Sequence, residues 1–122
     1  MGLDMYAYSR CTQPFEPTDF RWQETDEEFH YWRKHPDLHG WMEELYYAKG
    51  GRALEFNTVS VQLDAADLDR LELAIRGERL PETEGFFFGE SDGSEVIDDL
   101  AFVQQARQRL AQGLTVYYYS WW

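Results

Sequence analysis

The sequence predicts an α+β domain, in which a small antiparallel sheet of three or four strands carries about three helices on one face. Short segments that alternate apolar and polar residues indicate the strands, and longer segments with an apolar residue at every third or fourth position indicate the helices. Glycines, prolines and capping residues stand at the boundaries between them. The chain has 122 residues, so we expect a single domain over positions 1–122 with a core of its own.

Four segments are expected to form the sheet. Leu3–Ser9 and Thr58–Leu63 alternate apolar with polar residues, which is typical of strands buried on one face. Leu114–Trp122 is rich in aromatic residues, which favour strands. Gly85–Phe88 holds three consecutive phenylalanines, which fit a short strand buried on both faces. In the alternative interpretation this last segment is the wall of a ligand site, and its flanking glycines let a ligand approach the backbone.

The longest expected helix covers Asp26–Ala48, a segment that is rich in aromatic residues. Thr25 and Glu28 have the spacing of a capping box, and two glycines follow the segment. Pro36 interrupts it, and either kinks this helix or occupies the first position of a second one. The apolar stripe of the helix is expected to contain Tyr31, Leu38, Met42 and Leu45.

Two later helices have clearer boundaries. Asp64 can cap a helix over Ala65–Arg76, with Asp67 in its first turn and a glycine after its end. Another helix is expected over Glu95–Gln112, where apolar residues recur at helical spacing before Gly113. The junction before the first of these helices lacks the glycine patterns of phosphate-binding loops, and we expect no cofactor.

The chain is acidic, with a formal net charge of −12. A protein that binds nucleic-acid backbones needs a basic face, so direct nucleic-acid binding is not expected. The charge is compatible with a basic protein partner, with a cation or with a solvated acidic surface. Cys11 is the single cysteine, so no disulfide can form within the chain, and we expect a cytoplasmic protein without a membrane segment.

A group of large side chains with polar tips, together with one glycine, is the candidate ligand- or partner-binding site. A pure core would use Leu, Ile and Val at such positions. Arginine offers a bidentate fork and aromatic rings offer stacking faces, which suit a planar or anionic ligand. In the competing interpretation the aromatic residues fill the core, and their tips bond to the backbone. The candidate residues are Asp4, Tyr6, Tyr31, Trp32, Arg33, His39, Gly85, Tyr118 and Trp121.

Patterns for catalysis and metal binding are weak. His39 is a candidate general base, with Arg33 near it, but no Ser, Cys or carboxylate stands at a local spacing that marks a catalytic pair. His35 and His39 have the spacing of a zinc pair without the glutamate of a zinc-protease motif. The acidic sequence GESDGSEVIDD lacks the ligand offsets of a calcium loop. We therefore expect no bound metal, and an enzyme that uses His39 and Arg33 is the least favoured function.

Several short motifs together resemble a known group of sequences. They are the opening MGLDMY, the segment YWRK followed by His39 and Trp41, the GFFFG stretch, and the closing YYYSWW. As a set they resemble an uncharacterised family of small proteins from bacteria and their phages, whose members begin MGLDMYL. The motifs fall in the beginning, middle and end of the chain. The resemblance implies a phage or prophage context, in which small acidic proteins can counter host defence.

The residues from Glu82 to Asp99 form a second candidate surface. They include seven acids and no Lys or Arg, and we expect them to lie beside Trp121 and Trp122. Acids steer a basic partner and tryptophans anchor it, so the sequence predicts a non-catalytic protein that binds a basic host protein. The alternative is a pocket for a small anionic or planar ligand such as a nucleotide, in which Arg33 and His39 would contact the ligand and the acidic stretch would have no role. The oligomeric state is left open.

Overall fold

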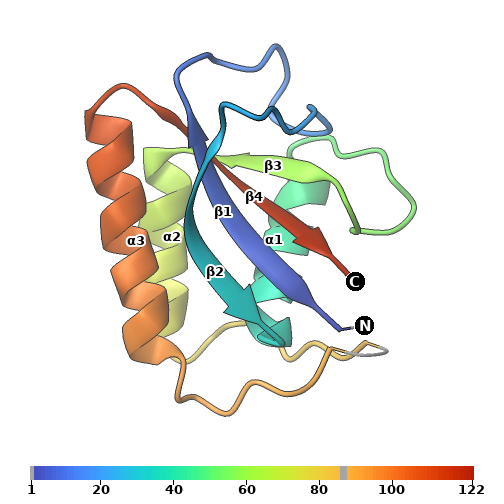
Figure 1. The fold of residues 1–122 in the computed structure, drawn as a ribbon. Coiled ribbons are helices and arrows are strands. Elements are labelled where there is room, and N and C mark those ends of the chain that lie inside the picture. The colour runs from blue at the N-terminus through green and yellow to red at the C-terminus, as the bar shows by residue number, and fades with distance from the viewer. Residues whose placement is uncertain (1, 86–87) are drawn as a thin grey trace.

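The computed structural model describes residues 2–85 and 88–122, in which the chain forms four strands and three helices (Figure 1). Strands and helices do not alternate regularly along the chain, which is typical of α+β folds. Within the described ranges, no helix combines the length and the apolar character that a membrane span requires. The elements are β1 Asp4–Arg10, β2 Glu27–Arg33, α1 Pro36–Ala48, β3 Ser60–Leu63, α2 Ala65–Arg76, α3 Val96–Ala111 and β4 Thr115–Trp121.

The sheet is antiparallel throughout, and its strand order is β2-β1-β4-β3. The strands from the two ends of the chain, β1 and β4, pair at its centre. Asp4 lies opposite Trp121 in that pair, so the two termini lie close together (Figure 1). A bulge between Ala7 and Tyr8 shifts the register between β1 and β2. The predicted α+β fold with a small antiparallel sheet and three helices is confirmed.

All three helices pack on the same face of the sheet, and the core lies between them and the strands (Figure 1). Met5 and Ala7 of β1 and Val116 and Tyr118 of β4 point toward the helices and are fully buried. The helices add the buried side chains of Leu38, Met42, Leu68, Leu71, Phe102 and Val103. Because strand residues alternate between faces, every second residue of β1 and β4 points to the opposite side of the sheet.

The helix predicted over Asp26–Ala48 is wrong in its first half, which forms strand β2. This segment pairs with β1 along its length. The hydrogen bonds between the two strands satisfy the backbone N–H and C=O groups that would otherwise bond within a helix. Thr25 therefore caps no helix. Lys34 follows the strand with a φ of 55°, a left-handed conformation that separates strand from helix. Pro36 then begins α1, as the second of the two interpretations of Pro36 predicts.

The strand predicted over Gly85–Phe88 is not formed at either of its ends. Gly85 and Phe88 lie outside the strands, and residues 86–87 lie outside the described part of the chain. Phe88 is buried, and its ring centroid lies 5.2 Å from that of His39. Gly85 lies so close to the Phe88 ring that a Cβ atom would have no room. Phe88 thus has the burial that the apolar pattern indicates, but a loop rather than the sheet provides it.

The remaining predicted elements are confirmed within one or two residues at each end, namely the strands over Leu3–Ser9, Thr58–Leu63 and Leu114–Trp122 and the helices over Ala65–Arg76 and Glu95–Gln112. The clearest case is the start of α2. The Asp67 N–H donates to the Asp64 carboxylate at 2.8 Å, and the Asp64 N–H donates to the Asp67 carboxylate at 2.9 Å. This reciprocal capping box explains why the helix begins where its sequence predicts.

Candidate functional site

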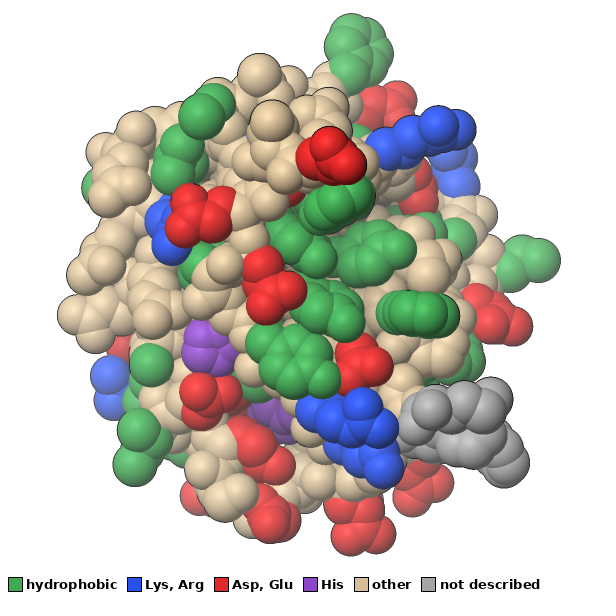
Figure 2. Space-filling model, in the orientation of Figure 1, with side chains coloured by type: hydrophobic (Ala, Val, Ile, Leu, Met, Phe, Trp, Pro, Cys, Tyr) green, Lys and Arg blue, Asp and Glu red, His purple; other side chains and the backbone are tan. Residues whose placement is uncertain are grey.

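The sheet face opposite the helices carries a continuous group of tyrosines. Tyr6 and Tyr8 of β1 alternate with buried core residues and therefore point to this face. The strand register places Tyr31 of β2 and Tyr119 of β4 on either side of Tyr6. Figure 2 shows hydrophobic side chains gathered over the middle of the sheet, with acidic side chains between them. The tyrosine face is defined here as Tyr6, Tyr8, Tyr31 and Tyr119, with Trp22 and Trp121 at its margins.

The rings of the tyrosine face touch one another and remain accessible. The centroid of the Tyr6 ring lies 5.3 Å from that of Tyr31 and 6.0 Å from that of Tyr8. The centroid of Tyr8 lies 6.4 Å from that of Tyr119. Tyr31 is 45% exposed, and Trp121 is 62% exposed. Tyr6, Tyr8 and Tyr119 are half-buried. A connected and partly exposed group of aromatic rings is typical of an interaction surface, because such rings lose little side-chain entropy on binding.

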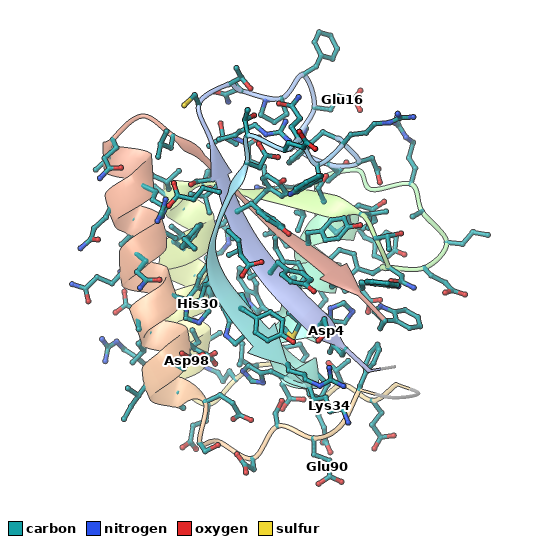
Figure 3. All side chains as sticks on the ribbon, viewed as in Figure 1. Asp4, Glu16, His30, Lys34, Glu90 and Asp98 are labelled. Atoms are coloured by element: carbon teal, nitrogen blue, oxygen red, sulfur yellow. The ribbon has the colours of Figure 1, made fainter. Side chains whose placement is uncertain are left out.

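Charged side chains stand among these rings. Asp4 lies at the end of the face near the N-terminus (Figure 3). Its carboxylate accepts a hydrogen bond from the Tyr31 hydroxyl at 2.5 Å and another from Arg33 Nη1 at 3.1 Å. Glu28 lies opposite Tyr8 in the register and is exposed. The face therefore offers aromatic rings and carboxylate acceptors side by side.

Burial and the nearby acids raise the pKa values of the tyrosines on this face. Burial and the nearby Glu28 carboxylate raise the pKa of Tyr8 to about 12. Burial, followed by the charge of Asp4, raises the pKa of Tyr6. The pKa of Tyr31 is raised chiefly by its hydrogen bond to Asp4. Near neutral pH these phenols are uncharged hydroxyl donors, as unperturbed phenols are. The carboxylates beside them favour a cationic partner group.

The end of this sheet face far from Asp4 is closed by the segment between β1 and β2. Arg10 donates to the Asp26 carboxylate through Nε at 3.0 Å and Nη2 at 2.6 Å, and the Tyr117 hydroxyl donates to it at 2.5 Å. The Arg10 guanidinium also lies 5.0 Å from the ring centroid of Phe20. Burial disfavours the charge of Asp26, but the hydrogen bonds from Arg10 and Tyr117 hold its pKa below the usual value. This buried cluster confines the open tyrosine face to the end nearer the termini.

A hollow of about 240 Å³ borders the tyrosine face between Trp22, Thr58 and Tyr119. Phe20 and Val59 also line it. Its wall thus combines aromatic and aliphatic side chains with the charged residues Asp19 and Arg21. A hollow of this kind can receive one apolar or aromatic side chain of a partner, which is how many interfaces anchor.

The structure divides the predicted site residues between the two sides of the sheet. The side that carries the tyrosine face brings together Asp4, Tyr6, Tyr31, Arg33 and Trp121. The core side contains the buried residues Trp32, His39 and Tyr118. Gly85 belongs to neither group, because it lies in the loop that packs against Phe88.

His39 is a core residue on the opposite side of the sheet from Arg33. Its Nδ1 lies 2.7 Å from the Tyr118 hydroxyl, and its ring packs against Phe56 and Phe88. Burial lowers the pKa of His39 to about 4, so the ring is neutral near neutral pH. Arg33 and His39 therefore do not line a common pocket for an anion.

The acidic stretch from Glu82 to Asp99 is only partly a free surface. Asp99 is buried and accepts a hydrogen bond from Trp32 Nε1 at 3.1 Å. Asp98 Oδ2 lies 3.0 Å from His30 Nε2, at the contact between β2 and α3 (Figure 3). These partners lie far from the stretch in the sequence. The exposed acids of the stretch include Glu82, Glu84, Glu90 and Asp92.

The two C-terminal tryptophans have different environments. Trp122 is docked, because its Nε1 donates to the Phe56 carbonyl at 2.8 Å and its backbone N–H donates to Asn57 Oδ1 at 2.9 Å. Its ring lies 5.1 Å from that of Phe88. Trp121 precedes it on the strand and is mostly exposed. Trp121 is therefore the C-terminal tryptophan that is available to a partner.

Three aromatic members of the tyrosine face are absent from the predicted site, namely Tyr8, Trp22 and Tyr119. The sequence pattern indicates the position of two of them, Tyr8 and Tyr119, on this face of the sheet. Tyr6 and Tyr8 share the pattern YAY, and Tyr119 shares one strand face with Tyr117 in the pattern YYY. Trp22 belongs to an irregular segment and carries no such periodicity.

No family model, no curated protein and no solved structure matches this chain.

Proposed function

We propose that this protein is a binding protein, and that it docks a basic segment of a partner protein on the tyrosine face. The observation that carries the proposal is the connected set of partly exposed tyrosine rings with Asp4 and Glu28 beside them. Lys and Arg side chains bind over the faces of such rings, and carboxylates accept their charged hydrogen bonds. The phenols of Tyr6 and Tyr8 are neutral near pH 7, as unperturbed phenols are, and their raised pKa values extend this to higher pH.

The charge of the chain favours the same kind of partner. A net charge of −12 attracts basic proteins over several ångströms and speeds their association. The acidic loop that contains Glu84 and Glu90 also contains Phe88, whose ring contacts Trp122 beside the end of the sheet. In this proposal the acids raise the association rate, and the aromatic rings lower the dissociation rate.

A nucleic-acid-binding host protein is the proposed class of partner, because the surface of such a protein must be basic. The resemblance to small proteins of bacteria and phages makes a counter-defence role part of the same proposal. A pocket for a small anion has less support. Arg33 already donates to Asp4, and His39 is buried across the sheet beside Tyr118.

Affinity capture from a bacterial lysate at low and high salt tests this function. We expect the wild-type protein to retain a basic protein at low salt, and the double variant Tyr6→Ser with Tyr31→Ser to lose it. Tyr47→Ser is the matched control, because Tyr47 is 43% exposed but lies on α1, on the other side of the sheet. Thermal melts of all variants confirm that they are folded. Equal capture by the double variant, or capture of no basic protein at either salt concentration, contradicts the proposal.

A further inference from the structure

Three polar side chains from separate segments meet near the N-terminal ends of α1 and α3. His35 precedes α1, Asp99 lies in the first turn of α3, and Ser91 lies in the loop that leads to α3. His35 Nε2 lies 2.8 Å from Asp99 Oδ2, and His35 Nδ1 lies 2.6 Å from Ser91 Oγ. His35 and Asp99 are buried, whereas Ser91 is half-buried. The three residues therefore form a hydrogen-bonded chain that runs from Asp99 in the interior, through His35, to the accessible hydroxyl of Ser91.

Further hydrogen bonds fix both ends of this hydrogen-bonded chain. Trp32 Nε1 donates to Asp99 Oδ1 at 3.1 Å, which orients the carboxylate and leaves Oδ2 for His35. The Asp37 backbone N–H donates to Ser91 Oγ at 3.1 Å. An ionised Asp99 only accepts hydrogen bonds, so His35 Nε2 carries a proton. In the neutral ring Nδ1 then holds a lone pair, and the Ser91 hydroxyl donates its proton to that nitrogen.

The hydrogen-bonded chain of three residues opens onto a cavity of about 290 Å³. This volume is near the lower end of the range for small-molecule sites. Asp37 lies in the first turn of α1, so the positive end of that helix points its N–H at Ser91 Oγ and stabilises negative charge there. The cavity is lined by His35, Ser91 and Asp99 together with the apolar side chains Ile75, Leu80 and Val96.

We propose that Ser91 is a nucleophile for small carboxylic esters, with His35 as its general base and Asp99 as the positioning residue for His35. A nucleophile, a base and an orienting carboxylate in one hydrogen-bonded chain are the groups that acyl transfer requires. In serine proteases the histidine Nε2 faces the serine and Nδ1 faces the carboxylate. In this protein the two nitrogens are exchanged, because Nδ1 faces Ser91 and Nε2 faces Asp99. Either ring nitrogen can accept the proton, because each has a lone pair in the ring plane.

The chemical step moves one proton and exchanges one acyl group. His35 Nδ1 takes the hydroxyl proton of Ser91 while Oγ bonds to the ester carbonyl carbon, and the carbonyl π electrons move to the carbonyl oxygen. When the carbonyl re-forms, the ester C–O bond breaks, and the departing alkoxide takes the proton from Nδ1 as an alcohol. Water then attacks the acyl-serine with the same base and releases the carboxylic acid and free Ser91.

The acids around the cavity select the class of ester. Glu95 Oε1 lies 4.0 Å from His35 Nδ1, and Asp37, Glu78 and Asp92 also line the cavity. These carboxylates repel anionic substrates, so the substrate is an ester with a neutral or cationic alcohol group. The activity goes beyond the docking of a partner, and it does not depend on the tyrosine face.

Labelling of the full chain with an alkyl fluorophosphonate tests the nucleophile. This probe phosphonylates an activated serine Oγ with loss of fluoride. We expect intact mass spectra to show one adduct, peptide mapping to place it on Ser91, and Ser91→Ala to abolish it. Ser94→Ala is the matched control and keeps the adduct, because Ser94 is an exposed serine that bonds to Asp92 instead of a histidine. We expect His35→Gln to slow labelling by about 100-fold or more, the usual contribution of a general base.

Absence of an adduct on Ser91 in folded wild-type protein overturns the proposal, whatever the His35 variant does. Labelling of His35→Gln at the wild-type rate also overturns it, provided that near-UV circular dichroism shows a native variant. Two variants of similar size separate the positioning role of Asp99 from a purely structural one. Asp99→Asn keeps the size of the side chain but removes the carboxylate that accepts from His35 Nε2, so labelling of Ser91 should slow, whereas Asp99→Glu keeps a carboxylate and should restore part of the rate. Equal labelling rates in Asp99→Asn and wild type refute the positioning role.

Discussion

The buried ion pair of Arg10 and Asp26 can be tested by removing its carboxylate. Asp26→Ala leaves the Arg10 guanidinium, whose side chain is 6% exposed, without the two bonds to Asp26. The Tyr117 hydroxyl and the Gln23 N–H lose the same acceptor. Removal of one member of a buried ion pair costs about 3–5 kcal/mol, because the other charge stays buried. Arg10 keeps its bond to the Arg21 carbonyl at 2.7 Å, so we expect about 3 kcal/mol, the lower end of that range.

Urea unfolding followed by tryptophan fluorescence measures this loss. For a domain of this size, about 3 kcal/mol corresponds to a fall in the melting temperature on the order of 10 °C. Glu16→Ala is the matched control, because Glu16 lies in the same segment and pairs with Arg52 at 3.3 Å with both side chains exposed (Figure 3). Exposed pairs contribute less than about 1 kcal/mol, so this variant should remain close to the wild type.

A small effect of Asp26→Ala would refute the buried cluster. In the helix predicted over Asp26–Ala48, Asp26 would be an acid at an exposed helix N-terminus. Removal of such an acid lowers the free energy of unfolding by less than about 1 kcal/mol. The pH dependence provides a second check. The pKa of Asp26 is lowered in the folded protein, so its stabilisation is complete above the ordinary carboxyl pKa of about 4 and is lost as the pH falls through the lower folded value. The difference between wild type and Asp26→Ala should therefore shrink below about pH 4.

Three further predictions concern stability. Arg33→Ala should lower the free energy of unfolding by less than about 1.5 kcal/mol, because the Arg33 side chain is 47% exposed. A loss above about 3 kcal/mol in urea melts would instead indicate that Arg33 belongs to a buried ion pair. Between pH 6.5 and about 4 only the unfolded state protonates His39, so the free energy of unfolding of the wild type should fall by about 3 kcal/mol over this range. Melts of His39→Phe should lack this part of the pH dependence. Asp64→Ala should cost about 1 kcal/mol by loss of the α2 cap, and an unchanged urea midpoint would contradict this.

The elements that the sequence predicted well are those whose boundaries depend on local interactions. The start of α2 is fixed by Asp64 and Asp67, which are three residues apart and form their capping bonds within one turn. The alternation in β1 likewise shows which residues are buried without knowledge of the partner strand. Strand β2 is different, because its pairing partner β1 lies about twenty residues earlier in the chain, and local spacing does not reveal the hydrogen bonds between them.

The group that contains Ser91 could not be predicted from local patterns for a similar reason. His35 is separated from Ser91 by 56 positions and from Asp99 by 64 positions, so no motif spacing relates them. The sequence indicated only the place of His35, which immediately precedes Pro36 and therefore lies at the N-terminal end of a helix. His39, the candidate base in the sequence, lies in the core beside Tyr118 and does not belong to this group.

The replacement of a helix by strand β2 changes the functional interpretation of the whole central segment. In a helix, Trp32 and His39 would share a stripe with Arg33 next to them, which suggests an anion pocket. In a strand, neighbouring residues point to opposite faces, so Trp32 enters the core while Tyr31 and Arg33 turn to the other side. There the sheet register brings Tyr31 and Arg33 to Asp4. The same residues that suggest an anion pocket in a helix thus become part of an aromatic surface with acids beside it, and such a surface suits a basic partner.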